Sequence, residues 1–389
     1  MRRREFIGLF GGVAAWPLAA RAQQGDRIRL IAVILGYTET DPETKSRIAA
    51  FRLGLEKRGW SEDRNIRIRY FFVAPGDMAQ QKIIKETVAL RPELILAHGT
   101  SIAAAVQHES QEIPVVFVSV SDPIGSGFIT NMARPGANLT GVMQYEPGIV
   151  SKWLSMLKEI APRMERAAVV ANPKSSPYDY FLRAARAAAA SLALEILPSP
   201  IENSPADIER VLDALGRTPN SGFIAAPDTT TILHRDTIIA LAAKHRLPAV
   251  YPYGFCVQAG GLMSYGTDQN ENFQLGAAYV DRILRGDKPA ELPVQAPTKF
   301  ETSVNLKTAK ALSLTVPPGL LVAADEVVEL MVECPAIGTK RTSACALHVS
   351  ACDPKRTLVT TIYWTEVQSR EDWIFDRFPA FRATAPRLR

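Results

Sequence analysis

The sequence predicts an α/β protein of two lobes, each built on a mainly parallel sheet with helices on both faces. Apolar runs of strand length alternate along the chain with segments whose apolar residues recur at helical spacing. The strand runs are apolar at consecutive positions, as in strands that are buried on both faces. This alternation starts a second time after residues 138–141, which predicts two successive lobes of similar size.

In the first half of the chain, the helix expected at residues 45–58 carries Ile48, Phe51 and Leu55 at helical spacing, and Gly59 ends it. The strands expected in this half occupy residues 29–35, 66–73, 94–97 and 114–118. The other helices occupy residues 78–90 and a segment that begins near residue 101.

The second half repeats the alternation. Its last elements are numerous enough for the chain to cross back from one lobe to the other. Strands are expected at residues 167–171, 193–197, 222–226, 249–251 and 262–265. Helices are expected at residues 150–160, 178–192, 206–215, 231–245 and 270–285. A last short helix is expected at residues 323–332, after the turn at Pro317 and Pro318.

Residues 1–22 have the order of parts found in an export signal. An R-R-x-F-I core at residues 3–7 is followed by an apolar run over residues 7–20. This run is too short to span a bilayer as an anchor. A small-x-small site ends at Ala22, so we expect a twin-arginine signal that is cleaved there and a mature chain in the periplasm of a bacterium.

The formal charge of +5 does not describe the body of the protein. Residues 1–22 carry four basic side chains against one acidic, and residues 330–389 carry nine against six, so each segment holds +3. Subtracting both contributions from +5 leaves residues 23–329 with a net charge near −1. A near-neutral body without a basic cluster argues against nucleic acid as a partner.

Polar residues follow the predicted strands at the edge where parallel sheets bind ligands. The loops at the carboxyl ends lead into helix N-termini, whose free N–H groups point into the crevice. The candidate binding residues at these loops are Tyr37, Thr100, Ser101, Ser121, Asp122, Asn172, Ser175, Asp228 and Tyr253. Thr100 and Ser101 are placed to cap the following helix and to present donors to a carboxylate. The whole set suits a zwitterion with an apolar tail.

Each candidate also has a purely structural explanation. Ser and Thr after a strand are often only helix N-caps, and Asp122 or Asp228 could be a capping carboxylate. Asn172 precedes a proline, which is common in turns. The five histidines lack paired metal spacing, and a surface or capping role is favoured for them. Only the convergence of several loops favours a binding site.

The sequence holds no motif typical of a catalytic or cofactor site. G-x-S-x-G, a Walker loop, G-x-G-x-x-G after the first strand and H-E-x-x-H are all absent from it. The cysteines lack zinc-site spacing, and Cys256 has no histidine near it in the sequence. We therefore expect no enzyme, no metal and no cofactor. A two-lobed enzyme that uses Asp122, Asp228 or Cys256 is a less favoured alternative.

Several segments, in order, resemble one protein family. VVFVSVSDPIGSGFI, ARPGANLTGV, HRDTIIALAAKHRLPAVYPYG and GGLMSYGTD are among them. They resemble the ABC-transporter substrate-binding protein family, whose better-known members are similar to tryptophan- and phenylalanine-binding proteins. The resemblance runs from about Ile28 to Glu329. It implies the type I periplasmic binding fold, with two Rossmann-like lobes, three crossovers and a ligand in the cleft between the lobes.

The resemblance also implies the domain organisation and the partners. Lobe 1 would comprise residues 27–145 plus 265–293, and lobe 2 residues 146–264 plus 294–329. The protein would be a monomeric periplasmic receptor for a small organic solute, with an amino acid or related carboxylate favoured. It would deliver this ligand to the permease of an ABC importer in the inner membrane. A sensory module that signals to a membrane receptor fits the same fold and stays an alternative.

Residues 330–389 depart from the pattern of the family. No period of 2 or 3.6 is sustained there, and Cys334, Cys345 and Cys352 occur without a matching motif. We expect an atypical, poorly ordered tail that can be removed without loss of stability. A small interaction module is the alternative.

Overall fold

The computed structural model describes residues 28–73, 77–146 and 148–329, together with four short strands farther along the chain. These strands are β13 (Val332–Glu333), β14 (Ala344–Cys345), β15 (Leu347–Ser350) and β16 (Thr360–Ile362). The chain divides into two compact units, Met1–Val328 and Glu329–Arg389. In the second unit, β13 pairs with β14 and β15 pairs with β16, both antiparallel. The predicted export signal and most of the predicted tail lie outside the described residues.

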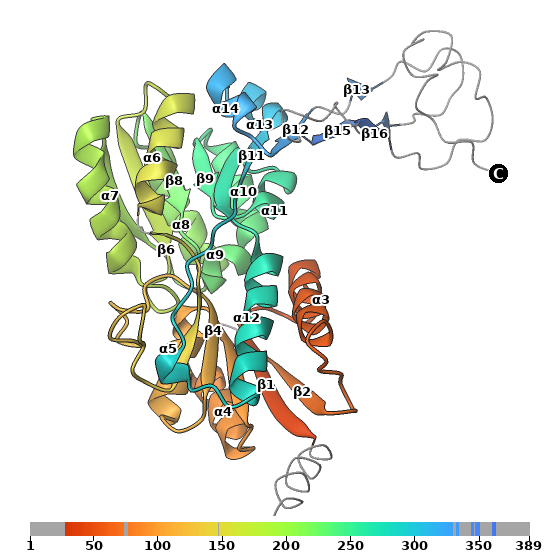
Figure 1. The fold of residues 1–389 in the computed structure, drawn as a ribbon. Helices are drawn as coiled ribbons and strands as arrows, with labels where there is room; N and C mark the ends of the chain where they lie inside the picture. The colour runs from red at the N-terminus through yellow and green to blue at the C-terminus, as the bar shows by residue number, and fades with distance from the viewer. Residues whose placement is uncertain are drawn as a thin grey trace, which may run out of the picture. The chain divides into compact units, whose positions relative to one another are not determined.

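The first lobe is built on a five-stranded sheet in the order β2-β1-β3-β4-β5, in which every pair is parallel. Its strands are β1 (Arg29–Leu35), β2 (Ile66–Phe72), β3 (Leu94–His98), β4 (Val115–Val120) and β5 (Leu139–Met143). The last three are buried at every position because helices cover both faces of the sheet. On one face lie α3 (Pro42–Glu56) and α12 (Gln269–Leu284), and on the other α4 (Asp77–Ala89) and α5 (Thr100–Glu109) (Figure 1).

The second lobe follows the strand order β12-β11-β10-β9-β8-β6-β7, in which only β10 and β11 are antiparallel. Its strands are β6 (Arg166–Ala171), β7 (Glu195–Pro200), β8 (Ser221–Ala225), β9 (Ala249–Tyr251), β10 (Met263–Thr267), β11 (Phe300–Asn305) and β12 (Glu326–Val328). The helices α6 (Ile149–Ile160) and α7 (Tyr178–Leu192) pack on one face through Trp153 and Phe181. The other face is covered by α8 (Pro205–Gly216) and α10 (Arg235–Lys244).

Shorter helices complete both lobes. They are α9 (Thr229–Leu233), α11 (Gly254–Gln258), the 3-10 helix η2 (Pro289–Glu291), α13 (Leu306–Ala311) and α14 (Pro318–Val322). Two of them, α9 after β8 and α11 after β9, start at the carboxyl ends of parallel strands of the second lobe, where the loops of the two lobes meet.

The chain crosses between the lobes after β5, after β10 and before β11. The boundary predicted between Ser264 and Tyr265 falls within β10, a strand of the second sheet. At the last crossing, Gln295 still pairs with Val142 of β5, two residues beyond the predicted boundary at residue 293. In Figure 1, α12 runs beside α3 although more than two hundred residues separate them.

The two mostly parallel sheets confirm the predicted fold class, and the differences concern particular elements. The predicted strand at residues 29–35 and helix at residues 178–192 match β1 and α7. The single helix expected at residues 231–245 is instead two helices, α9 and α10, which meet at His234. The helix expected at residues 323–332 was a wrong prediction, since β12 lies within that range and pairs with β11. Two consecutive valines in EVV favour a strand there.

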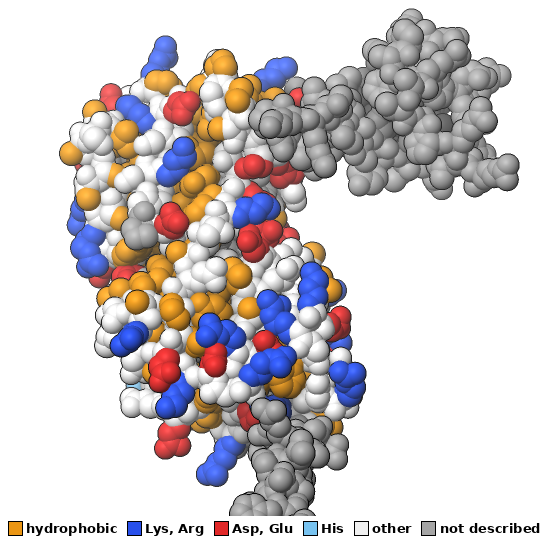
Figure 2. Space-filling model, in the orientation of Figure 1, with side chains coloured by type: hydrophobic (Ala, Val, Ile, Leu, Met, Phe, Trp, Pro, Cys, Tyr) orange, Lys and Arg blue, Asp and Glu red, His pale blue; other side chains and the backbone are white. Residues whose placement is uncertain are grey.

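Within the described ranges, the longest helices are too short or too polar for a membrane span, and none qualifies as one. Figure 2 shows acidic and basic side chains interspersed over the described part of the face in view.

Candidate ligand-binding cleft

The loops at the carboxyl ends of the two sheets enclose a small polar cavity of about 20 Å³. It is lined from both lobes by Tyr37, His98, Gly99, Thr100, Ser119, Gln144, Ser175, Pro227, Asp228, Thr229 and Tyr253. A cavity of this volume has room for about one water molecule. The residues that surround it are hydroxyls, amides, an acid and aromatic rings, as is usual in sites for small polar ligands.

A larger open hollow of about 750 Å³ lies at the other end of the second sheet. Met164, Asn220 and Pro248 line it, and each precedes a strand of that sheet. Ligands of parallel α/β sheets bind at the opposite, carboxyl end, where helix N-termini converge. We therefore take the small cavity between the lobes as the candidate site.

Five of the nine predicted residues line this cavity. They are Tyr37, Thr100, Ser175, Asp228 and Tyr253. Two more lie one hydrogen bond away: the Ser121 hydroxyl donates to Oε1 of Gln144 at 3.1 Å, and the Asn172 backbone N–H donates to Oδ2 of Asp228 at 3.1 Å.

Ser101 and Asp122 do not line the cavity. The backbone carbonyl of Ser101 accepts a hydrogen bond from Gln80 at 3.3 Å. The carboxylate of Asp122 accepts the N–H of Gly125 at 2.8 Å and so stabilises its own turn. A ligand in the small cavity would not contact either side chain in the closed arrangement.

Asp228 is a buried capping carboxylate as well as a wall of the cavity. Its Oδ1 accepts the N–H groups of Thr230 at 2.6 Å and Thr231 at 3.1 Å, in a capping box at the start of α9. The same oxygen accepts the Ser175 hydroxyl at 3.0 Å. Burial raises the pKa of Asp228 to about 6, although these hydrogen bonds act to lower it. This acid is therefore held rigidly and titrates close to neutral pH.

The start of α5 differs from the expectation that Thr100 and Ser101 cap it. The N-cap is Gly99, whose φ of 87° suits glycine, and no side chain caps the helix. Thr100 is the first helical residue, and its hydroxyl oxygen accepts the backbone N–H of Ser121 at 3.3 Å. The first turn of α5 therefore presents N–H groups that no side chain caps, next to the cavity.

A network of amides in the first lobe, centred on Gln144 and Gln269, was not predicted from the sequence. The amide of Gln144 donates to the hydroxyl of Tyr253, so it joins the first lobe to the second. Ser119, with φ of 61°, donates to Oε1 of Gln269 at 2.7 Å. Gln144 directly follows β5, a strand that was not predicted, and its loop was therefore not considered.

Two buried groups near the cavity are held in their neutral forms. Burial and the nearby charge of Arg47 lower the pKa of His98 well below its usual value. Its ring packs 5.1 Å from that of Tyr37, which is not the surface or capping role expected for the histidines. Burial raises the pKa of the Cys256 thiol, so this cysteine is a poor nucleophile.

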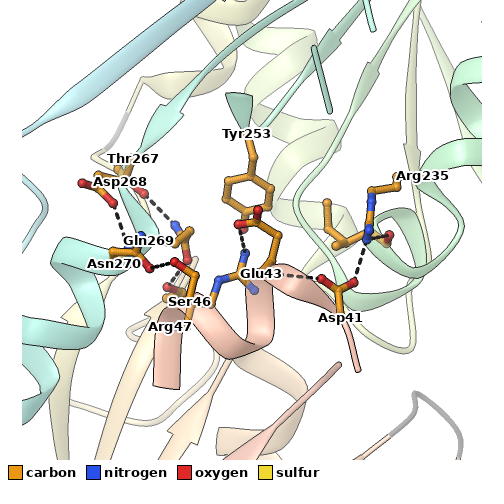
Figure 3. Close-up of polar contacts among 12 residues, drawn as sticks. Asp41, Glu43, Ser46, Arg47, Arg235, Tyr253, Thr267, Asp268, Gln269 and Asn270 are labelled. Atoms are coloured by element: carbon orange, nitrogen blue, oxygen red, sulfur yellow. Dashed lines mark hydrogen bonds and ion pairs between the residues drawn. The ribbon is translucent and has the colours of Figure 1, made fainter. Parts of the chain in front are cut away.

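The lobes are in direct contact around the cavity. Arg235 of the second lobe pairs with Asp41 of the first, with 2.8 Å between Nη1 and Oδ2 (Figure 3). A Cβ added at Gly36 would lie 3.0 Å from Oγ1 of Thr229, so the backbone after β1 lies directly against the start of α9. An organic ligand needs several hundred Å³. The lobes must separate before such a molecule can enter.

The chain is similar to known proteins over most of its length. A family described as "ABC transporter substrate binding protein" matches residues 39–328. The chain is 23% identical over 287 residues to a tyrosine-binding protein of Clostridioides difficile (strain R20291), an alignment that covers 73% of this chain and 80% of the relative.

Solved structures share the fold. One, from Streptococcus pneumonia and in complex with L-Trp, has a TM-score of 0.72 at 20% identity and covers 78% of this chain and 100% of its own. Another is the ligand-free, open structure of a substrate-binding protein with adhesive properties from Clostridium difficile. It has a TM-score of 0.56 at 20% identity, and the match covers 75% of this chain and 97% of the chain in that structure. With two parallel-sheet lobes around a polar cavity and a family match over most of the chain, this protein belongs to the ABC transporter substrate-binding protein family.

Proposed function

We propose that this protein is the periplasmic receptor of an ABC importer and that it binds an amino acid or related carboxylate between its lobes. The observation that carries the proposal is the cavity at the carboxyl ends of both sheets, lined by polar groups from both lobes. The receptor would be exported by the twin-arginine signal, act as a monomer and hand its ligand to a permease in the inner membrane.

The relatives support this class of ligand. One relative is named a tyrosine-binding protein, and one solved structure holds L-Trp. Both ligands are aromatic amino acids, and the cavity of this chain is bordered by the rings of Tyr37 and Tyr253. An aromatic side chain could pack against such rings while its zwitterionic end meets the polar loops.

The cavity offers a partner for each end of a zwitterion. The uncapped first turn of α5, with Thr100 and Ser101, would donate hydrogen bonds to the carboxylate. Asp228, whose pKa of about 6 leaves its carboxylate mostly ionised at neutral pH, would accept the ammonium. Ser121 would position Thr100 through its backbone N–H, and Asn172 and Ser175 would position Asp228.

A thermal-shift screen with amino acids, sugars and neutral aromatics tests the proposal. Aromatic amino acids should raise the melting temperature, and calorimetry should give saturable binding with one site. Asp228→Ala should then weaken an amine-bearing ligand by more than about tenfold, because a desolvated charge loses its partner.

Asp213→Asn is the matched control, since this acid pairs with Lys244 and His245 on the outer surface of the second lobe. Its affinity for the ligand should equal that of the wild type. Stabilisation by sugars or neutral aromatics alone would contradict the amino acid proposal.

A further inference from the structure

Arg47 of α3 is a buried cation whose donors have no hydrogen-bond partner in the described part of the chain. Its side chain is 1% exposed, and within the described residues Nε, Nη1 and Nη2 all lack an acceptor. The nearest carboxylate is that of Glu43, one turn earlier, with 3.9 Å between Nη2 and Oε2. The side chain of Glu43 is 34% exposed, so solvent also interacts with its carboxylate. The donors of a guanidinium are rarely left without acceptors inside a protein.

The surroundings of Arg47 are aromatic and come from both lobes. Its guanidinium carbon lies 4.8 Å from the ring centre of Tyr37 in the first lobe. Tyr253 and Phe255 of the second lobe stack on each other, and each ring centre lies 5.9 Å from the guanidinium carbon. Figure 3 shows Tyr253 reaching toward Arg47 on α3. Contacts with rings offset part of the cost of burying the charge. Among the described residues, no acceptor, the Tyr37 hydroxyl included, meets the donors of Arg47 in hydrogen-bonding geometry.

The position of Arg47 connects it to the candidate site. Tyr37 and Tyr253, which contact it, are two walls of the cavity between the lobes. Because Tyr253 and Phe255 belong to the second lobe, separation of the lobes removes them from Arg47. In such an open arrangement the guanidinium would face the cleft, where an incoming anion could reach it.

We propose that Arg47 is the cationic partner of the ligand's carboxylate. This inference rests on the proposed function and moves the charged contact from the start of α5 to α3. A carboxylate can accept two parallel hydrogen bonds from a guanidinium, which is the strongest common pairing for both groups. When the lobes close on such a ligand, the buried donors gain acceptors. Without a ligand, closure buries them unpaired, so Arg47 links closure to the presence of a carboxylate.

The test compares ligands with and without the carboxylate. Calorimetry is carried out with L-tyrosine against tyramine and with L-tryptophan against tryptamine, for the wild type, Arg47→Gln, Arg47→Lys and Arg52→Gln. The wild type should bind the amino acid at least roughly 30-fold more tightly than the amine. In Arg47→Gln this preference should fall to within about threefold, while affinity for the amine changes little.

Arg52→Gln is the matched control. Arg52 lies on the same helix, is 49% exposed and pairs with Glu62 at 3.0 Å, away from the cleft. The Arg52→Gln variant should prefer the amino acid over the amine as strongly as the wild type does. If Arg47→Gln does not fold, Arg47→Lys decides the question. It keeps the charge but cannot form the bidentate pair, so the preference should fall by about tenfold.

Three results would overturn the proposal. They differ in whether the proposed function is also contradicted. A full preference for the amino acid in Arg47→Gln would remove Arg47 from the site but leave the proposed function intact. Loss of the preference in Thr100→Val, with Arg47→Gln unaffected, would place the carboxylate at α5. Failure of the wild type to bind either amino acid in preference to its amine would contradict the proposed function together with this inference.

Discussion

Arg235 at the start of α10 and Asp41 at the N-cap of α3 form an ion pair across the cleft, with 2.8 Å between Nη1 and Oδ2. Their side chains are 21% and 13% exposed. The other carboxylate oxygen of Asp41 accepts the N–H of Glu43 at 2.9 Å and caps the helix. Burial pushes the pKa of Asp41 upward, but the hydrogen bonds from Arg235 and Glu43 outweigh it and hold the pKa below its ordinary value. The pair is therefore charged at neutral pH and favours the closed arrangement of the lobes.

Asp41→Asn separates the two roles of this residue. Asparagine caps helices as well as aspartate does, so α3 should keep its stability. Loss of the ion pair should weaken the closed state by about 1 kcal/mol, and ligand affinity should fall about fivefold in calorimetry. Asp287→Asn, which removes an exposed pair with Arg282 in the first lobe, serves as the control. Equal affinities for Asp41→Asn and the control would show that the pair does not contribute to closure.

The raised pKa of Asp228 predicts how stability depends on pH. Burial raises this pKa from 3.8 to about 6, so between these values the folded protein binds a proton that the unfolded chain does not. The contribution of Asp228 to the free energy of unfolding should therefore increase as pH falls from 7 to 4. Relative to Asp228→Asn, the gain should approach roughly 3 kcal/mol. Urea unfolding at several pH values measures it, and parallel curves for the two proteins would contradict the prediction.

His98 has the opposite dependence on pH. Burial and the charge of Arg47 keep its pKa well below 6.5, so below that pH the unfolded chain binds a proton that the folded protein excludes. The wild type should lose stability relative to His98→Gln as pH falls below 6.5, by at most about 1.4 kcal/mol per pH unit. The same unfolding series tests this. If the wild type and His98→Gln differed in free energy of unfolding by the same amount from pH 7 to pH 5, a neutral, buried imidazole would be contradicted.

Gly54 lets α3 pack closely against α12 and so fixes the helix that carries Arg47. A Cβ at this position would lie 2.7 Å from Cβ of Ala277 and 3.3 Å from Cα of Gln274. Gly54→Ala should therefore destabilise the protein by about 1 to 3 kcal/mol, although alanine favours helices. Thermal unfolding measures this change. A stabilised variant would mean that α12 can move away at no cost.

Much of the fold could be predicted from the sequence, because buried parallel strands and amphipathic helices leave strong periodic patterns. β1 and α7 illustrate this, since the bounds predicted for them match those of the structure. β5 was missed because LTGVM is short and contains a glycine. α11 was missed because five residues cannot display a helical period.

The site was only partly predictable, for a different physical reason. Asp228 and Tyr253 could be found because they lie in the short loops that follow strands at the ligand-binding edge. Arg47 could not, since a charged residue in a helix is normally on its solvated face. Its burial depends on Tyr253 and Phe255, which are more than two hundred residues away along the chain. Only the packing of the two lobes reveals that, among the described residues, its guanidinium has no hydrogen-bond acceptor.

A small organic ligand held between the lobes should draw them together, and small-angle scattering of the full protein measures this change. The probe is whichever of L-tyrosine, L-tryptophan and L-phenylalanine binds most tightly in calorimetry. We predict that the radius of gyration decreases when this amino acid saturates the protein, because the lobes close around it. Saturable binding with an unchanged radius of gyration would contradict the account and would place the ligand elsewhere, for example in the 750 Å³ hollow of the second lobe.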